Sequence, residues 1–166
     1  MERRELFGSL ASKIKGGKKQ EKRLRPPYFS IDNEDIESLF QSECHKCEAK
    51  CATVCEEDII KIADDKTPYI VFNNSNGCTF CDECAIACEF GVLHVENKQN
   101  ISAVITINKD KCVSWHHTMC FSCKDPCLDK AIDFAAMFMP TINDNCTSCG
   151  FCINRCPTDA IDIKVF

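Results

Sequence analysis

Apolar and polar positions alternate over four short stretches of the chain, and each stretch follows a cysteine. In all four, the fourth, fifth and seventh positions after the cysteine are apolar, and the sixth is polar or charged. The stretches are CEEDIIKI from Cys55, CEFGVLHV from Cys88, CLDKAIDF from Cys127 and CPTDAIDI from Cys156. This alternation is typical of a strand with one buried face. We therefore expect strands over 59–62, 92–95, 131–134 and 160–163.

Two further stretches are rich in strand-forming residues and precede cysteines. PYIVF covers 68–72, and ISAVITI covers 101–107. The polar stretches NNSNG and NDN contain asparagine, aspartate or glycine, which favour turns. The repeated unit is therefore a strand, a cysteine loop, a short helical turn and a second strand, which predicts a fold of the α+β class.

The chain of 166 residues contains sixteen cysteines, a large share for a protein of this length. They form four groups of four, and no cysteine lies outside a group. Group one is Cys44, Cys47, Cys51 and Cys55; group two is Cys78, Cys81, Cys84 and Cys88; group three is Cys112, Cys120, Cys123 and Cys127; group four is Cys146, Cys149, Cys152 and Cys156. Groups two and four have the spacing C-x2-C-x2-C-x3-C. Group one is one residue longer in the middle, and group three has seven residues between its first two cysteines.

Disulfides and bound metal are the two ways in which a protein can use so many cysteines. Disulfides form in exported proteins, and a secretory signal requires an uninterrupted apolar run. Arg3 and Arg4 resemble the start of a twin-arginine signal, but four lysines between residues 13 and 19 stand where that run should be. We therefore expect a cytoplasmic protein, in which thiols stay reduced and clustered cysteines bind metal. No apolar stretch approaches the length of a membrane span, so we expect no membrane-spanning segment.

The spacing of the groups favours iron–sulfur clusters over zinc. C-x2-C-x2-C-x3-C is the bacterial ferredoxin motif for [4Fe–4S] clusters, and in group four Pro157 follows it, as in that motif. Structural zinc sites are usually built from two separated C-x2-C pairs. Three closely spaced thiolates can instead hold three corners of one cuboidal cluster. The sequence therefore predicts four [4Fe–4S] clusters, with zinc as the competing metal.

Pairing the groups in chain order predicts the architecture. In two-cluster ferredoxins the fourth cysteine of one motif ligates the cluster of the other motif. We therefore expect two tandem bacterial 2[4Fe–4S] ferredoxin-like units, over 28–104 and 105–166, after a basic N-terminal extension over 1–27. The expected ligand sets are Cys44, Cys47, Cys51 and Cys88; Cys78, Cys81, Cys84 and Cys55; Cys112, Cys120, Cys123 and Cys156; and Cys146, Cys149, Cys152 and Cys127. In the alternative arrangement, each group keeps all four of its cysteines on its own cluster.

Charge is divided unevenly along the chain. Residues 1–25 carry nine Lys or Arg against three Asp or Glu, a net charge of +6, and the remaining residues carry −11. An acidic cluster-binding body predicts a redox partner with a basic face and no binding to nucleic acid. Leu6, Leu10 and Ile14 are spaced as on one face of a helix. The tail is therefore either a solvated segment or a helix that docks on a partner or on a membrane surface.

The seven residues between Cys112 and Cys120, VSWHHTM, include the only tryptophan, Trp115, and two histidines. Rieske-type ligation replaces cysteine by histidine, and group three already has four cysteines, so no histidine ligand is expected. The loop is interpreted either as a solvated cover over its cluster or as a contact surface for a partner.

The whole pattern resembles the NapF-type ferredoxins, which are cytoplasmic accessory proteins of bacterial periplasmic nitrate reductase systems. The resemblance covers nearly the whole chain, and includes Arg3 and Arg4, the RPP motif at 25–27, the two pairs of cysteine groups and the long gap in group three. It implies that the protein binds the precursor of the nitrate reductase catalytic subunit before export, for maturation or reduction. The alternative is a general electron-transfer ferredoxin, or an electron-input subunit of another oxidoreductase complex. The chain has no phosphate loop and no nucleophile with a paired base, so no enzymatic activity is expected.

Overall fold

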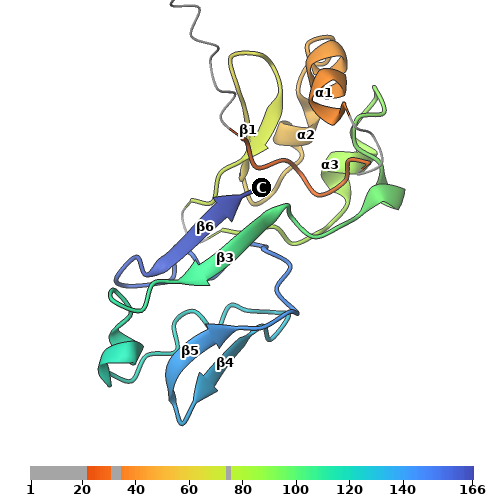
Figure 1. Ribbon diagram of the computed structural model, residues 1–166. Helices are drawn as coiled ribbons and strands as arrows, with labels where there is room; N and C mark the ends of the chain where they lie inside the picture. The colour runs from red at the N-terminus through yellow and green to blue at the C-terminus, as the bar shows by residue number, and fades with distance from the viewer. Residues whose placement is uncertain (1–21, 31–34, 74–75) are drawn as a thin grey trace, which may run out of the picture.

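The computed structural model describes residues 22–30, 35–73 and 76–166, and Figure 1 shows how their short elements are arranged. The helices are α1 (Ile36–Cys44), α2 (Lys50–Thr53) and α3 (Glu83–Ile86), with the 3-10 helices η1 (Val95–Asn97) and η2 (Val113–His116). The strands are β1 (Ile60–Ile62), β2 (Pro68–Ile70), β3 (Ala103–Ile107), β4 (Ile132–Ala135), β5 (Phe138–Ile142) and β6 (Ile161–Val165). This small, mixed content of helices and strands is compatible with a ferredoxin-like fold. Across the described ranges, no helix has the length and apolar character needed to cross a bilayer.

Residues 103–166, called the C-terminal part below, combine a pair of end strands with a hairpin. The first and last strands of this part, β3 and β6, lie side by side in Figure 1, and Ile105 pairs with Ile163 in antiparallel register. Between them in the chain, β4 and β5 form the hairpin, in which Phe134 faces Pro140. One face of each strand is buried, as the apolar alternation requires. The buried side chains form a small core of Ile105, Ile132, Cys152 and Ile161.

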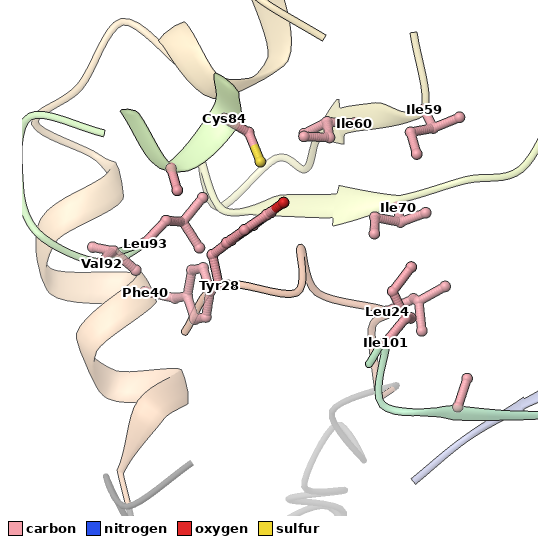
Figure 2. Packing of buried hydrophobic residues seen from close by; sticks show 12 residues of the cluster. Leu24, Tyr28, Phe40, Ile59, Ile60, Ile70, Cys84, Val92, Leu93 and Ile101 are labelled. Atoms are coloured by element: carbon pink, nitrogen blue, oxygen red, sulfur yellow. The ribbon is translucent and has the colours of Figure 1, made fainter. Parts of the chain in front are cut away.

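The described residues up to 102, called the N-terminal part, have a larger apolar core (Figure 2). The antiparallel hairpin of β1 and β2 contributes Ile60 and Ile70 to it. Helix α1 contributes Phe40, which is fully buried, and the segment before the first cysteine group contributes Tyr28. Aromatic side chains of this size bury a large apolar area and stabilise the core accordingly. The core is therefore completed by residues that precede group one.

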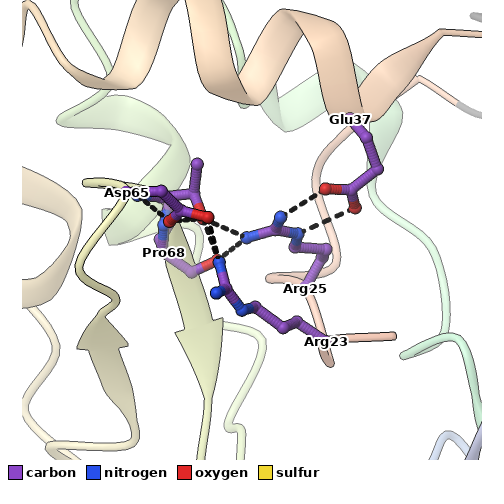
Figure 3. A network of polar contacts seen from close by, with 6 residues as sticks. Arg23, Arg25, Glu37, Asp65 and Pro68 are labelled. Carbon is purple, nitrogen blue, oxygen red and sulfur yellow. Dashed lines mark hydrogen bonds and ion pairs between the residues drawn. The ribbon is translucent and has the colours of Figure 1, made fainter. Parts of the chain in front are cut away.

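The buried residue Arg25 holds this preceding segment in place (Figure 3). Its guanidinium donates hydrogen bonds to Glu37 Oε1 at 3.1 Å, Thr67 Oγ1 at 2.9 Å and the Pro68 carbonyl oxygen at 2.5 Å. It also lies 4.5 Å from the ring centroid of Phe40. A buried cation is tolerated only when its donors are paired, and here they connect the N-terminal segment to α1 and to β2.

Most of the expected strands are confirmed. The strands expected over 59–62, 131–134 and 160–163 correspond to β1, β4 and β6, and the stretches PYIVF and ISAVITI contain β2 and β3. The strand expected over 92–95 is wrong, because the chain there is irregular and continues into η1. The segment opposite it contains Pro26 and Pro27, which have no N–H to donate to a strand ladder. Residues 92–95 make one backbone hydrogen bond to this segment, from the His94 N–H to the Tyr28 carbonyl oxygen at 2.8 Å.

Helix α1 and strand β5 were not expected from the sequence, and neither were the 3-10 helices η1 and η2. Helix α1 has its apolar residues Ile36, Leu39 and Phe40 at helical spacing, which could have predicted it. Strand β5 contains Pro140, and a proline usually argues against a strand. Proline is tolerated here because β5 is an edge strand of a two-stranded sheet. The expected apolar stripe Leu6, Leu10 and Ile14 lies outside the described residues.

Candidate iron–sulfur sites

The sixteen cysteines surround four separate cavities, with four cysteines at each, and all sixteen are free thiols. Site one is lined by Cys44, Cys47, Cys51 and Cys88. Site two is lined by Cys55, Cys78, Cys81 and Cys84. Site three is lined by Cys112, Cys120, Cys123 and Cys156. Site four is lined by Cys127, Cys146, Cys149 and Cys152. Each cavity thus combines the first three cysteines of one group with the fourth cysteine of another.

Burial keeps several of these thiols in their neutral form. Burial is the main reason that the pKa of Cys44 rises to about 12, and the nearby sulfurs of Cys51 and Cys88 add to the rise. Burial likewise raises the pKa of Cys84 and of Cys152 to about 12, again with neighbouring cysteine sulfurs adding to the effect. Four thiolates close together in a buried cavity repel one another. A positively charged metal centre would remove this cost, because thiolates are its ligands.

Short helices position the third cysteine of groups one and two. Helix α2 carries Cys51 and helix α3 carries Cys84, and each helix begins one residue before its cysteine. The residues before these helices, Ala49 and Asp82, are both left-handed, with φ of 59° and 68°. The extra residue of group one therefore lies ahead of α2, and the third cysteine keeps the same place on its helix.

A left-handed residue follows the fourth cysteine of every group, three positions later. These residues are Asp58 (φ 51°), Gly91 (φ 67°), Lys130 (φ 51°) and Asp159 (φ 47°). In groups two, three and four the chain then turns back, so that a backbone N–H reaches the sulfur of the fourth cysteine. Ala131 N lies 3.2 Å from Cys127 Sγ, Ala160 N lies 3.2 Å from Cys156 Sγ, and Leu93 N lies 3.4 Å from Cys88 Sγ. Such bonds stabilise a thiolate and tune a bound metal. The sequence analysis did not predict these N–H to sulfur bonds, although the three residues that separate each fourth cysteine from the following apolar stretch could have indicated them.

The long loop of group three folds back on the hairpin of β4 and β5. Its first four residues form η2, and the Trp115 indole donates a hydrogen bond of 3.2 Å to the Pro140 carbonyl oxygen. His117 makes an edge-to-face contact with Phe138, at 5.8 Å between ring centroids. The loop also places Ser114, which the sequence analysis did not single out, in the wall of site three. The loop therefore packs on β5 and contributes Val113 and Ser114 to the wall of site three.

The arrangement of sulfurs fits a multi-iron cluster. At each site four thiols surround a shared cavity, as is needed when each binds a different iron of one cuboidal cluster. The N–H donors directed at Cys88, Cys127 and Cys156 are a further feature that such clusters use.

Comparison with known proteins identifies the family. The family model described as a 4Fe-4S binding domain matches residues 139–162, which contain group four. The ferredoxin-type protein NapF of Escherichia coli strain K12 is 32% identical over 143 residues, which cover 83% of this chain and 82% of that protein. The chain belongs to the NapF family of ferredoxin-type proteins. The resemblance inferred from the cysteine spacing is thereby confirmed.

Two other relatives were found, one of them a second NapF protein. The NapF protein of Haemophilus influenzae is 32% identical over 146 residues, 85% of this chain and 78% of the relative. A putative electron transport protein of Escherichia coli strain K12, YsaA, is 32% identical over 91 residues, 54% of this chain and 52% of the relative. The likeness to the NapF family thus extends over most of the chain, well beyond a single cysteine motif.

Proposed function

We propose that this protein is an electron-transfer protein that holds four [4Fe–4S] clusters in two tandem 2[4Fe–4S] ferredoxin-like units, over 28–104 and 105–166. The observation that carries the proposal is the sorting of sixteen cysteines into four cavities, each with three cysteines of one group and one of its paired group. This is the crossed pattern of ligands in two-cluster ferredoxins. We assign the four cysteines that line each of sites one to four as the ligands of one cluster.

The clusters would supply one-electron transfer, and the chain supplies their ligands, the hydrogen bonds to sulfur and the apolar surroundings. The cysteine thiolates bind iron, and backbone donors such as Ala131 N and Ala160 N stabilise the negative charge on sulfur. Buried side chains such as Val92 and Ile161 keep water away from the sulfurs. Since every iron would have a thiolate ligand, none is open to substrate, and the protein carries electrons without enzymatic chemistry of its own.

The proposed partner is the precursor of a nitrate reductase catalytic subunit, met in the cytoplasm before its export. Membership of the NapF family supports this partner. The residues after 25 carry a net charge of −11, which favours a partner with a basic surface. Binding would serve either reduction or maturation of the precursor.

The second candidate is a general electron carrier without a dedicated partner, and the similarity to a putative electron transport protein favours it. The two candidates differ in what they bind. A dedicated accessory protein retains the precursor in a pull-down from anaerobic cytoplasm, and a general carrier gives only transient encounters with several reductases.

The experiment that tests the proposal is metal analysis of anaerobically purified protein, followed by that pull-down. Four clusters correspond to about sixteen irons and about sixteen acid-labile sulfides per chain. Zinc in stoichiometric amounts without sulfide would contradict the proposal. For the partner, the cluster-loaded protein should retain the precursor, and a form stripped of its clusters is the matched control.

A further inference from the structure

The long loop of group three carries a buried hydroxyl group without a hydrogen-bond partner. Ser114 is only 1% exposed, and in the described part of the chain its Oγ makes no hydrogen bond. An unpaired buried hydroxyl loses its hydrogen bonds to water and gains nothing in return. Folded proteins rarely keep such a group unless a ligand or a functional partner uses it.

The backbone around Ser114 holds it in the wall of site three, beside the cysteines of that site. The Trp115 N–H donates to the Cys112 carbonyl oxygen at 3.0 Å, and the Thr118 N–H donates to the Val113 carbonyl oxygen at 3.0 Å. The Trp115 side chain is tied to Pro140 on β5. These bonds hold η2 in place on both sides of Ser114, and the residue lies buried between them.

The surroundings of Ser114 point to sulfur as the missing partner. The other two hydroxyl groups that line site three both lie beside cysteine sulfurs: Ser122 Oγ is 3.5 Å from Cys120 Sγ, and Thr158 Oγ1 is 3.7 Å from Cys156 Sγ. The remaining side chains of the wall are apolar and offer no acceptor, namely Ile107, Val113, Pro140, Pro157, Ala160 and Ile161. Apart from the Ser122 and Thr158 hydroxyls, which already lie beside cysteine sulfurs, the side-chain acceptors inside this cavity are the sulfurs themselves.

We propose that the Ser114 hydroxyl donates a hydrogen bond to a sulfur atom of the cluster at site three and thereby raises the reduction potential of that site. The inference rests on the proposed function, because it requires a cluster there. A donor directed at sulfur stabilises the extra negative charge of the reduced state, and hydrogen bonds to sulfur are among the factors that set cluster potentials. A cluster held by the cysteines of site three would take one electron from an external one-electron donor on reduction, while the proton would stay on Ser114 Oγ and no bond would break.

This role gives the seven-residue spacing of group three a physical reason. Groups two and four have only two residues between their first and second cysteines, which leaves no room for a helical turn. The longer loop forms η2 and delivers a side-chain donor into the cavity. Ser114 is not an iron ligand; it acts on the site through the hydrogen bond.

The test is a redox titration of the full-length, cluster-loaded protein followed by electron paramagnetic resonance (EPR). In Ser114→Ala, one of the four reduction steps should shift to lower potential, and the other three should stay at their wild-type values. Ser114→Thr keeps the hydroxyl and should restore the wild-type potential of that step. Ser148→Ala is the matched control, because Ser148 is also a buried serine but donates its hydrogen bond to the Ala103 carbonyl oxygen at 2.7 Å. It should leave the Ser114-dependent step unchanged.

A second measurement compares the unaltered protein with Ser114→Ala. After a brief exposure of both to D2O, pulsed EPR of the reduced proteins should detect a deuteron close to one cluster in the unaltered protein that is missing from Ser114→Ala, whereas the deuterons of Ser122 and Thr158 should be common to both. Four unshifted potentials in Ser114→Ala with full iron and sulfide content would overturn the inference, as would the absence of this deuteron. Failure of the proposed function looks different, because the wild-type protein itself would then lack iron and sulfide.

Discussion

The backbone N–H of Cys78 donates a hydrogen bond of 2.7 Å to the carbonyl oxygen of Cys149. This bond joins group two, in the N-terminal part, to group four, in the C-terminal part. Within each part the sites are also neighbours, since Cys51 of site one lies near Cys84, and Cys123 of site three lies near Cys152. These contacts connect the four sites in the order one, two, four and three.

Replacement of Gly77 by alanine should weaken the junction between sites two and four. A Cβ at this position would lie 2.6 Å from the Cys149 carbonyl oxygen and 2.7 Å from Phe151 Cγ, so the two segments must move apart. Overpacking of this kind costs about 1–3 kcal/mol. We expect a lower unfolding temperature and faster hydrogen exchange at the Cys78 amide, measured by NMR or mass spectrometry.

Gly91→Ala is the matched control for that variant. It also replaces a glycine, at φ 67°, but a Cβ there would meet only the His94 ring, at 3.2 Å, and not the C-terminal part. It should lower stability through backbone strain while exchange at the Cys78 amide stays as in the wild type. Equal exchange at Cys78 in both variants would show that the hydrogen bond to Cys149 does not join the two parts in solution.

Removal of Cys88 should empty site one rather than site two. If Cys88 completes the ligand set of Cys44, the single variants Cys88→Ala and Cys44→Ala should each lose about four of about sixteen irons. The double variant should lose no more than either single variant, because both changes affect one cluster. Iron and sulfide analysis of the purified proteins is the measurement.

The combination of Cys88→Ala with Cys84→Ala provides the contrast. These residues line different cavities, so the double variant should lose about eight irons, two clusters of four. The reverse result would be a loss of about four irons in the Cys88→Ala, Cys84→Ala variant and of about eight in the Cys88→Ala, Cys44→Ala variant. It would support the arrangement in which each group keeps its own four cysteines.

Arg25→Met should destabilise the N-terminal part far more than Arg23→Met. Arg25 is buried, and its removal leaves Thr67 Oγ1 and the Pro68 carbonyl oxygen without this donor, at a cost of about 2–3 kcal/mol. Arg23 forms an ion pair with Asp65 near the surface, at side-chain exposures of 35% and 42%, and such pairs contribute about 0–1 kcal/mol. Chemical unfolding of both variants measures how much each change lowers the free energy of unfolding. Similar losses would mean that the Arg25 network adds nothing beyond a surface ion pair.

Acid should promote loss of the clusters. Burial raises the pKa of Cys84 and of Cys152 to about 12, so below that pH a proton competes with iron for each of these sulfurs. The competition strengthens as pH falls, and cluster retention should therefore be best at mildly alkaline pH and worst in acid. The loss of visible absorbance over time at pH 9, 7 and 5, at constant ionic strength, measures this dependence. Faster loss at pH 9 than at pH 5 would contradict it.

The sequence by itself determined the type of site and most of the strands. Four cysteine groups with fixed spacing predict iron–sulfur ligands, because three closely spaced thiolates match three corners of one cluster. The alternation after each fourth cysteine predicted β1, β4 and β6, because a strand with one buried face repeats every second residue. The long gap in group three also indicated the family, which the relatives confirm.

The sequence predicts crossed sets of cysteines and leaves open the alternative in which each group stays together, and only the tertiary structure shows that Cys44 and Cys88, which are far apart in the chain, line one cavity. The tertiary structure also decided that residues 92–95 form no strand, because the backbone bonded to them, at Tyr28, belongs to the irregular N-terminal segment that follows Pro26 and Pro27. The contact of Cys78 with Cys149 and the orphan hydroxyl of Ser114 have no sequence signal either. The spacing of cysteines within a group predicts how that loop folds, because it depends on neighbouring residues. Contacts between loops depend on how the whole core packs.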